Sequence, residues 1–132
     1  MSQVAAFEAE FTTGGPRLIL RAEGVALALA AAAAYAAGGH GWLLFAALFL
    51  TPDLSFAAYS FGPRVGAFVY NGFHSTVPAL ALAAVGQALG ASEVVAVALI
   101  WLAHIGFDRA LGYGLKYGSA FADTHLGRIG KA

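Results

Sequence analysis

The chain has 132 residues, of which 60% are hydrophobic and 11% carry a charge. Soluble domains average roughly a quarter charged residues, so this composition indicates an integral membrane protein, and the length predicts a single domain over residues 1–132. Seven basic and seven acidic residues cancel, so charge gives no reason to expect a nucleic-acid partner. The absence of cysteine excludes disulfides, cysteine-bound metal and thiol chemistry.

Four apolar stretches of membrane-spanning length follow one another, separated by glycine- and proline-containing turns. About 20 predominantly apolar residues cross a bilayer as an α-helix. The expected helices run from about 18 to 37, 42 to 61, 65 to 89 and 94 to 116, followed by a more polar tail over 118–132. Pro52 predicts a kink in the second helix, because proline removes a backbone hydrogen bond. The sequence therefore predicts an all-α, four-helix transmembrane bundle.

The basic residues fall on one side of this bundle. They are Arg17, Arg21, Arg64, Arg109, Lys116, Arg128 and Lys131. The loops on the opposite side hold only His40 and Glu93 as ionisable residues. Because cytoplasmic loops carry the excess of lysine and arginine, we expect both termini to be cytoplasmic, in a multi-pass protein of the bacterial inner membrane.

Ionisable side chains on all four expected helices lie in the cytoplasmic half of the bilayer. At about 1.5 Å per residue, Glu23 lies roughly 8 Å, Asp53 roughly 12 Å and His74 roughly 14 Å from the cytoplasmic ends of their helices. Counted from Tyr113 at the membrane interface, His104 lies roughly 14 Å and Asp108 roughly 8 Å in, and their spacing of four places them on one helix face. Each charge deep in the membrane costs about 2.5–3.5 kcal/mol on insertion scales, so such residues usually face the bundle interior. We therefore expect them to form one polar pocket.

Other polar residues are expected to support this pocket. They are Tyr70, Asn71, Arg109, Asp123 and His125. Tyr70 and Asn71 share a helix face with His74. Arg109 either snorkels to the interface or neutralises a carboxylate on a neighbouring helix. The two tail residues either fold back over the mouth of the pocket or belong to an amphipathic segment on the membrane surface.

Four sequence blocks carry a resemblance to a known family. The blocks are LRAEG, TPDLS, GPRVGAFVYNGFH and AHIGFDRALGYGLKYGSAFADTHLG. Together they resemble a bacterial family of small integral membrane proteins, the domain of unknown function four-two-six-zero, over nearly the whole chain from Leu18 to Gly127. The resemblance implies the membrane class and singles out the same polar positions, but it implies no substrate.

The first functional hypothesis is a metal site. Two imidazoles, His74 and His104, and two carboxylates, Asp53 and Asp108, fit a mononuclear Zn²⁺, Fe²⁺ or Mn²⁺ centre. Glu23 and Asp108 are then the candidate catalytic carboxylates, with Glu23 as general base or a further ligand. A bound metal lowers the pKa of a water ligand and permits hydrolysis. This hypothesis describes a metal-dependent, hydrolase-like membrane enzyme with a small-molecule or lipid substrate.

Three other hypotheses use the same residues. The cluster can be a structural polar network that joins helices in a subunit of a membrane complex. It can serve proton- or ion-coupled transport, in which Glu23 and Asp53 are the coupling residues and the chain forms a homodimer. Alternatively, His74 and His104 can bind a haem iron, because they lie at matching depth.

Overall fold

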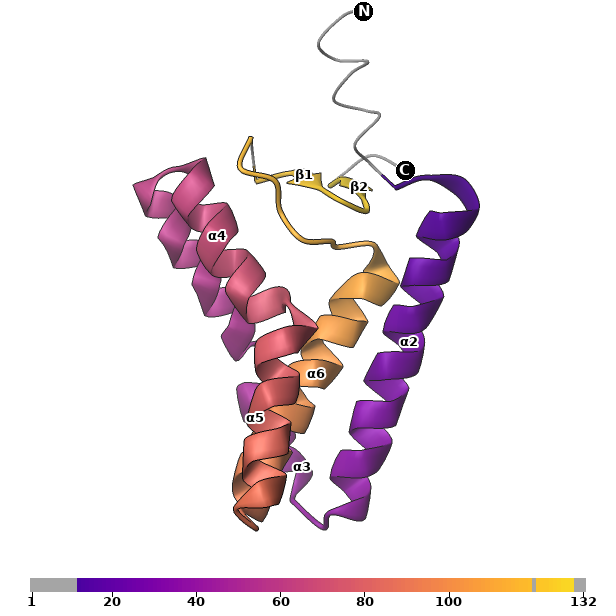
Figure 1. Ribbon diagram of the computed structural model, residues 1–132, viewed down its shortest axis with the longest axis vertical. Coiled ribbons are helices and arrows are strands. Elements are labelled where there is room, and N and C mark those ends of the chain that lie inside the picture. Colours follow the sequence, from indigo (N-terminus) through magenta and orange to yellow (C-terminus); the bar gives the residue numbers. More distant parts are fainter. Residues whose placement is uncertain (1–11, 120, 130–132) are drawn as a thin grey trace, which may run out of the picture.

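The computed structural model describes residues 12–119 and 121–129, and helices dominate them, which confirms the all-α prediction (Figure 1). The helices are α2 (Gly14–Ala37), α3 (Trp42–Leu48), the 3₁₀ helix η1 (Thr51–Phe61), α4 (Pro63–His74), α5 (Thr76–Ala88) and α6 (Ser92–Leu111). After α6 the tail forms two short antiparallel strands, β1 (Asp123–Thr124) and β2 (Gly127–Arg128).

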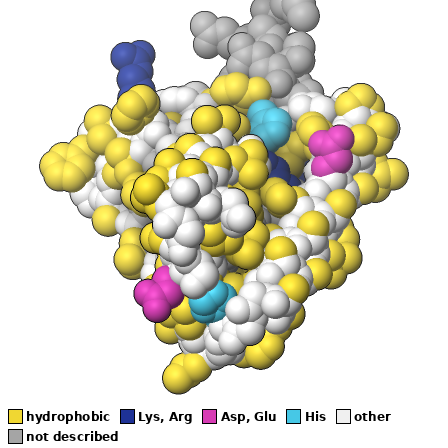
Figure 2. Space-filling view, turned by 60° about the horizontal axis from the view of Figure 1, so that its bottom comes forward, with side chains coloured by type: hydrophobic (Ala, Val, Ile, Leu, Met, Phe, Trp, Pro, Cys, Tyr) yellow, Lys and Arg dark blue, Asp and Glu magenta, His cyan; other side chains and the backbone are white. Residues whose placement is uncertain are grey.

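Three helical segments are long and apolar enough to cross a membrane, namely Gly14–Ala37, Trp42–Phe61 and Ser92–Leu111. Hydrophobic side chains, with a few charged ones among them, cover much of the face in Figure 2. The helix expected over 65–89 is divided at Ser75, whose extended backbone has φ −83° and ψ 141°. Its two parts have 12 and 13 residues, too few to cross a bilayer alone. The prediction of one continuous helix was wrong, and a fourth crossing by α4 and α5 together stays a prediction.

Pro78 explains the division between α4 and α5. Proline has no N–H, and its ring clashes with the carbonyl group four residues earlier, which here belongs to His74. Ser75 caps α5 by accepting a hydrogen bond from the backbone N–H of Val77 at 3.3 Å. The carbonyl groups of Phe73 and His74 therefore lose their usual partners within the helix.

Pro52 divides the second apolar segment in the same way, as its position predicts. The α-helix α3 ends before it, and the chain continues as the 11-residue 3₁₀ helix η1, although runs of this helix longer than about 3–4 residues are uncommon. In a regular α-helix residue 52 would donate to the carbonyl oxygen of Leu48. The side chain of Thr51 donates to that oxygen instead, at 2.7 Å.

Helices α2 and α6 approach each other closely at two glycines. A Cβ atom added to Gly106 would lie 2.6 Å from the backbone nitrogen of Ala28. A Cβ atom on Gly24 would lie 2.7 Å from the carbonyl oxygen of Gly106. Small residues at such a crossing allow the two backbones to make dispersion contacts that larger side chains would prevent. Along the same pair, Ala31 and Ile105 are buried in the apolar core.

Helix α6 ends at Leu111, earlier than the predicted boundary at 116. Gly112 adopts a left-handed conformation with φ 88°, which is a common way to end an α-helix. The N–H of Tyr113 then donates to the carbonyl oxygen of Asp108 at 2.8 Å. The prediction ran too far because Tyr113–Tyr117 is apolar and aromatic enough to resemble the end of a membrane helix.

The tail folds over the end of the molecule where α2 begins (Figure 1). Five basic residues whose side chains the structure describes lie at that end, namely Arg17, Arg21, Arg64, Arg109 and Lys116. The Arg21 Nε atom donates to the carbonyl oxygen of Ala110 at 2.9 Å, and the Arg17 Nε atom donates to that of Leu126. Lys131 lies outside the described residues.

Candidate metal site

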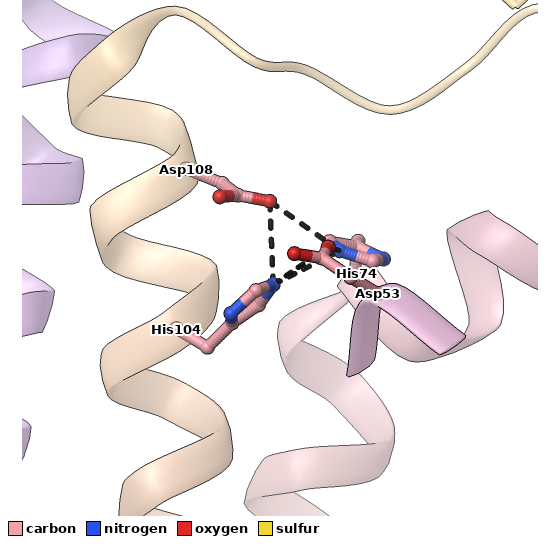
Figure 3. Close-up of side chains that lie close together, drawn as sticks. All are labelled: Asp53, His74, His104 and Asp108. Atoms are coloured by element: carbon pink, nitrogen blue, oxygen red, sulfur yellow. Dashed lines mark hydrogen bonds and ion pairs between the residues drawn. The ribbon is translucent and has the colours of Figure 1, made fainter. Parts of the chain in front are cut away.

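Four side chains from three segments converge on one point (Figure 3). Asp53 comes from η1, His74 is the last residue of α4, and His104 and Asp108 lie one turn apart on α6. One potential ligand atom from each residue lies within 4.8 Å of the others. These are the four residues that the sequence assigns as metal ligands. The structure brings them together, whereas binding of a metal stays a prediction.

Five of the six separations between these atoms are close to the edges of a tetrahedron around a small cation, and the sixth, between the Asp53 and Asp108 oxygens, is at most 4.8 Å. The Nε2 atom of His74 lies 3.2 Å from Asp53 Oδ1 and 3.3 Å from Asp108 Oδ2. The Nε2 atom of His104 lies 3.2 Å and 3.4 Å from the same two oxygens, and 3.1 Å from Nε2 of His74. Zinc–ligand bonds of about 2.0–2.1 Å give tetrahedral edges of about 3.3–3.4 Å. Both histidines thus have the spacing that binding of one ion together with the two carboxylates requires.

The ring of His74 is oriented by its own helix. Its Nδ1 atom lies 2.9 Å from the carbonyl oxygen of Tyr70, and a carbonyl oxygen only accepts, so Nδ1 carries a proton. In the neutral ring, Nε2 then presents its lone pair to the cluster. The Tyr70 ring also stacks on the His74 ring, with centroids 3.7 Å apart and planes within 8°. A carbonyl partner of this kind is usual for metal-binding histidines.

Three of the four cluster residues are buried, and Asp53 is partly exposed. The side chains of His74 and His104 are each 1% exposed and that of Asp108 is 11% exposed, whereas that of Asp53 is 32% exposed. With neutral histidines, the lone pair of His74 and the charges of two carboxylates would face one another with little water to screen them. Such an arrangement requires a positive charge, which either protons or a metal ion can provide.

Two side chains of α6 hold the carbonyl groups that the break at Ser75 leaves free. The Arg109 Nη2 atom donates to the carbonyl oxygen of His74 at 2.9 Å, and the Trp101 Nε1 atom donates to that of Phe73 at 2.6 Å. Arg109 therefore fixes the backbone of a candidate ligand, a role that neither sequence hypothesis for it foresaw.

Trp101 is a supporting residue that sequence reasoning missed. The available signal was Pro78, which lies four residues after His74. Its position implies that nearby carbonyl groups need donors from another helix.

Asn71 attaches the tail to α4. Its Nδ2 atom donates to the carbonyl oxygen of Lys116 at 2.8 Å, and its Oδ1 atom accepts from the Lys116 N–H at 2.6 Å. The Lys116 Nζ atom lies 4.8 Å from the ring centre of Tyr70 and 3.7 Å from that of Phe121. Burial lowers the pKa of Lys116 from 10.5 to about 8. Because Tyr70 also stacks on His74, the Tyr70 ring lies between Lys116 of the tail and the candidate ligand His74.

Asp123 and His125 lie in the folded tail and do not join the cluster. Asp123 is buried and accepts a hydrogen bond from Ser119 Oγ at 2.8 Å. The Nδ1 atom of His125 accepts from the N–H of Leu115 at 2.9 Å, and burial together with the charge of Arg109 lowers the pKa of His125. The tail therefore folds back onto the protein, whereas a position over the mouth of the pocket stays a prediction.

Glu23 also lies away from the cluster, which corrects the expectation that it faces the pocket. Its side chain is exposed, while the next residue, Gly24, contacts Arg109 and Ala110 near the end of α6. Consecutive residues of an α-helix are rotated by about 100°, so contact through Gly24 turns Glu23 off the packed face. A role for Glu23 as ligand or general base has no contact to support it.

The spacing of the two histidines contradicts the haem hypothesis. Two axial ligands bind haem iron from opposite faces of the porphyrin ring, so the ring must fit between them. The two Nε2 atoms are 3.1 Å apart, and the Asp53 oxygen lies 3.2 Å from each. No gap for the macrocycle exists between these side chains.

The fold and the cluster together define a class of protein, all-helical, with helices that can span a membrane and a buried set of metal-type donors. The chain belongs to the family described as Domain of unknown function (DUF4260), whose model matches residues 17–129. This match confirms the resemblance drawn from the sequence blocks, and it includes all four cluster residues. No curated protein and no solved structure matches the chain.

Proposed function

We propose that this protein is a multi-pass protein of the bacterial inner membrane that holds one divalent metal ion and uses it in hydrolysis. The four ligands are Asp53, His74, His104 and Asp108. The observation that carries the proposal is the set of five nitrogen–oxygen and nitrogen–nitrogen separations of 3.1–3.4 Å. Imidazole and carboxylate donors suit Zn²⁺, Fe²⁺ and Mn²⁺, and these five separations agree with the edges expected around zinc.

The distribution of basic residues supports an orientation with both termini in the cytoplasm. The five described basic side chains lie at one end of the molecule, and the positive-inside rule assigns that end to the cytoplasm. His104 lies seven residues before the end of α6, which corresponds to a depth of about 10 Å. The metal site would then lie in the cytoplasmic half of the bilayer, with α4 and α5 forming the fourth crossing.

The donor types and the exposure of one ligand support a chemical role. Structural zinc sites are most often rich in cysteine and closed to solvent, whereas this cluster has two carboxylates and no cysteine. The Asp53 side chain is 32% exposed, and its contacts with both histidines use Oδ1, so Oδ2 is the atom available to accept a proton. Catalytic zinc sites keep one position open for water, so water would have to take a fifth position or replace the exposed Asp53, and the metal would then lower the pKa of that water from 15.7 to about 7.

Hydrolysis at this site requires no change of oxidation state. The hydroxyl group of water bonds to the electrophilic carbon or phosphorus atom of the substrate. The bond to the leaving oxygen breaks with its electron pair on that oxygen, which takes up the remaining proton. Asp53 is the side chain placed to accept that proton and pass it on, while the carbonyl group of Tyr70 and the side chain of Arg109 keep His74 in position.

The same cluster supports proton-coupled transport as a second candidate. Buried histidine and aspartate side chains within hydrogen-bond distance form proton relays in membrane proteins, and a proton would satisfy the converging lone pairs as a metal does. The two candidates differ in whether a metal ion binds at all.

Isothermal titration of the metal-free protein in detergent with Zn²⁺ tests the proposal. We expect one zinc ion per chain, loss of binding in His104→Ala, and unchanged binding in the control His40→Ala, whose ring contacts Tyr35 near the other end of α2. Wild-type protein that binds no zinc, iron or manganese but titrates protons would favour transport and reject the metal site.

A further inference from the structure

The tail, described over residues 113–119 and 121–129, contacts two different parts of the helical fold. The first part consists of α2 and α5 packed along α6, and the second consists of η1 and α4 packed on each other. The tail follows α6 directly after Gly112, and the carbonyl oxygen of Leu126 accepts a hydrogen bond from Arg17 of α2. It is therefore attached to the first part, whereas α4 of the second part diverges from α2 toward the end where the tail lies (Figure 1).

Two contacts attach the tail to the second part. The side chain of Asn71 on α4 exchanges two hydrogen bonds with the backbone of Lys116, at 2.6 and 2.8 Å. The ring of Phe121 packs against those of Phe56 and Tyr59 on η1, with centroids 5.3 and 5.1 Å away. The tail thus contacts each of the two segments through which the second part supplies a donor to the cluster.

These contacts lie on the helix faces that carry the metal-type donors. Residues three apart eclipse one another in a 3₁₀ helix, so Asp53, Phe56 and Tyr59 share one face of η1. On α4, a separation of three residues places Asn71 on the same face as His74. The attachment points of the tail therefore continue the two faces that meet at the cluster.

A stack of aromatic rings joins the attachment points to a candidate ligand. The Phe56 ring stacks on that of Tyr70, with centroids 5.3 Å apart, and Tyr70 stacks on His74 at 3.7 Å. The contacts thus run from Phe121 of the tail, through both segments of the second part, to the site. A displacement of the tail would move Asp53 and His74 together, relative to the two donors on α6.

Internal bonds make the tail a folded unit that can transmit such a constraint. Its strands β1 and β2 pair with each other, and Lys116 and Thr124 form a further antiparallel bridge. The Lys116 Nζ atom also donates to the carbonyl oxygen of Phe121 at 2.7 Å. Thr124 and Leu126 are fully buried. The bond to Arg17 at one side of the tail and the contacts of Phe121 at the other are therefore connected by paired backbone.

We infer that the tail connects the two parts and holds the donors of the second part at the distance that a metal ion requires. Asn71 and Phe121 are then positioning residues, since their described bonds and ring contacts reach the tail and η1 but none of the four donors. The connection stands on the contacts above. Its influence on metal binding rests on the proposed function.

Distances between spin labels test the connection in the absence of metal. The chain has no cysteine, so labels attach only to Leu18→Cys on α2 and Phe68→Cys on α4, at positions 69% and 81% exposed. We expect double electron–electron resonance to give one narrow distance distribution, and Asn71→Ala and Phe121→Ala each to shift it to longer distances and broaden it. A distribution that neither variant changes would overturn the inference, whatever the metal does.

Zinc titration of the same substitutions, made in the chain without labels, tests the influence on the site. We expect Asn71→Ala and Phe121→Ala each to weaken zinc binding at least about tenfold, the lower end of the range for groups that orient metal ligands. Phe121→Tyr keeps the ring and should bind zinc as the wild type does. The matched controls Gln87→Ala and Tyr113→Ala remove an exposed amide and an exposed ring, and both should leave the affinity unchanged.

The two measurements separate the inference from the metal function. Weaker zinc binding in both tail variants, with wild-type binding in Phe121→Tyr and in the controls, supports the inference. Unchanged zinc binding in Asn71→Ala and Phe121→Ala overturns the positioning role, and equal weakening in the controls overturns it as well, because the effect is then general destabilisation. Longer label distances in variants of a protein that binds no zinc would reject the metal function and support the connection alone.

Discussion

The molecule has two parts that are held together in different ways. In the first part, α2 and α5 pack along α6, with the glycine crossing at Gly24 and Gly106. In the second part, η1 and α4 pack on each other. Among the described helices, η1 and α4 make no extensive backbone contact with α2 or α6, and α4 diverges from α2 toward the end that carries the tail (Figure 1). Close apolar packing forms each part, whereas the joint between them contains the polar cluster beside the aromatic pair of Phe73 and Trp101.

The candidate metal site lies at this joint. Asp53 and His74 come from the second part, while His104 and Asp108 come from the first. The hydrogen bond from Arg109 to the His74 carbonyl oxygen crosses the same joint. A metal ion would therefore connect the two parts as well as provide a chemical centre. This connecting role would explain why titratable residues lie inside an otherwise apolar bundle.

Removal of one ligand from either part tests this joint most strongly. We expect His74→Ala and His104→Ala each to weaken zinc binding by more than about 100-fold, since even a second-shell partner is worth about 10–100-fold. Zinc at about 100 times its dissociation constant should stabilise the wild-type protein by about 2.7 kcal/mol. Thermal unfolding with and without zinc measures this effect. If zinc still raised the unfolding temperature of one of the two variants, zinc binding would not require histidines from both parts.

Gly106→Ala tests the packing of the first part alone. The added Cβ would meet the backbone of Ala28, so the helices must separate, and we expect a loss of about 1–3 kcal/mol of unfolding free energy. Gly72→Ala is the control, because a Cβ there meets nothing within 4 Å and alanine improves helix propensity by about 0.8–1 kcal/mol. Denaturation in mixed detergent micelles compares them. Equal stability of the two variants would contradict the close α2–α6 contact.

Acid should loosen the tail. The pKa of His125 lies below its ordinary 6.5 because of burial and the charge of Arg109, so the unfolded tail binds more protons in this range. Stability from the neutral ring is therefore complete above pH 6.5 and is lost as the pH falls through the lowered pKa. Hydrogen exchange at the Leu115 amide, which donates to His125, should accelerate on acidification beyond the change in intrinsic rate.

His125→Asn provides the matched comparison for the tail. Asparagine retains an oxygen acceptor for the Leu115 amide but does not titrate. We expect its protection to be independent of pH between 7 and 5, after the same correction. Identical acid sensitivity in the variant and the wild type would assign the effect to another group.

The smallest expected effect concerns one hydrogen bond across the joint. Trp101→Phe removes the donor to the Phe73 carbonyl oxygen, and interhelical bonds of this kind contribute about 0.6 kcal/mol on average in membranes. Trp42→Phe, which changes the same residue type at an exposed position, is the control for lost aromatic packing. A larger loss in Trp42→Phe than in Trp101→Phe would argue against a role for the Trp101 bond.

Helical spacing predicted much of the cluster. A separation of four residues places His104 and Asp108 on one face, and the depths of Asp53 and His74 follow from helix length alone. Depth does not determine rotation, however, which is why Glu23 was expected in the pocket. Its direction depends on the α2–α6 crossing at Gly24, a tertiary contact that periodicity in an alanine-rich helix does not show.

The breaks in the helices were predicted unevenly. Pro52 was recognised as a kink, but Pro78 was treated as part of a continuous helix, so the free carbonyl groups and their donors Trp101 and Arg109 were not foreseen. The end of α6 was also placed too late, because the aromatic segment after Gly112 resembles an interfacial helix end. The 3₁₀ form of η1, which positions Asp53, was not predicted, because Pro52 indicates only that the α-helix is interrupted.

X-ray absorption spectroscopy of the zinc-loaded protein tests the central claim most directly. We expect the zinc edge to show four nitrogen and oxygen neighbours at about 2.0–2.1 Å, with the outer-shell scattering of two imidazole rings. Loss of one imidazole contribution in His74→Ala and in His104→Ala would assign the rings. A shell of six oxygen atoms without imidazole scattering, or zinc that washes off the purified protein, would contradict the account.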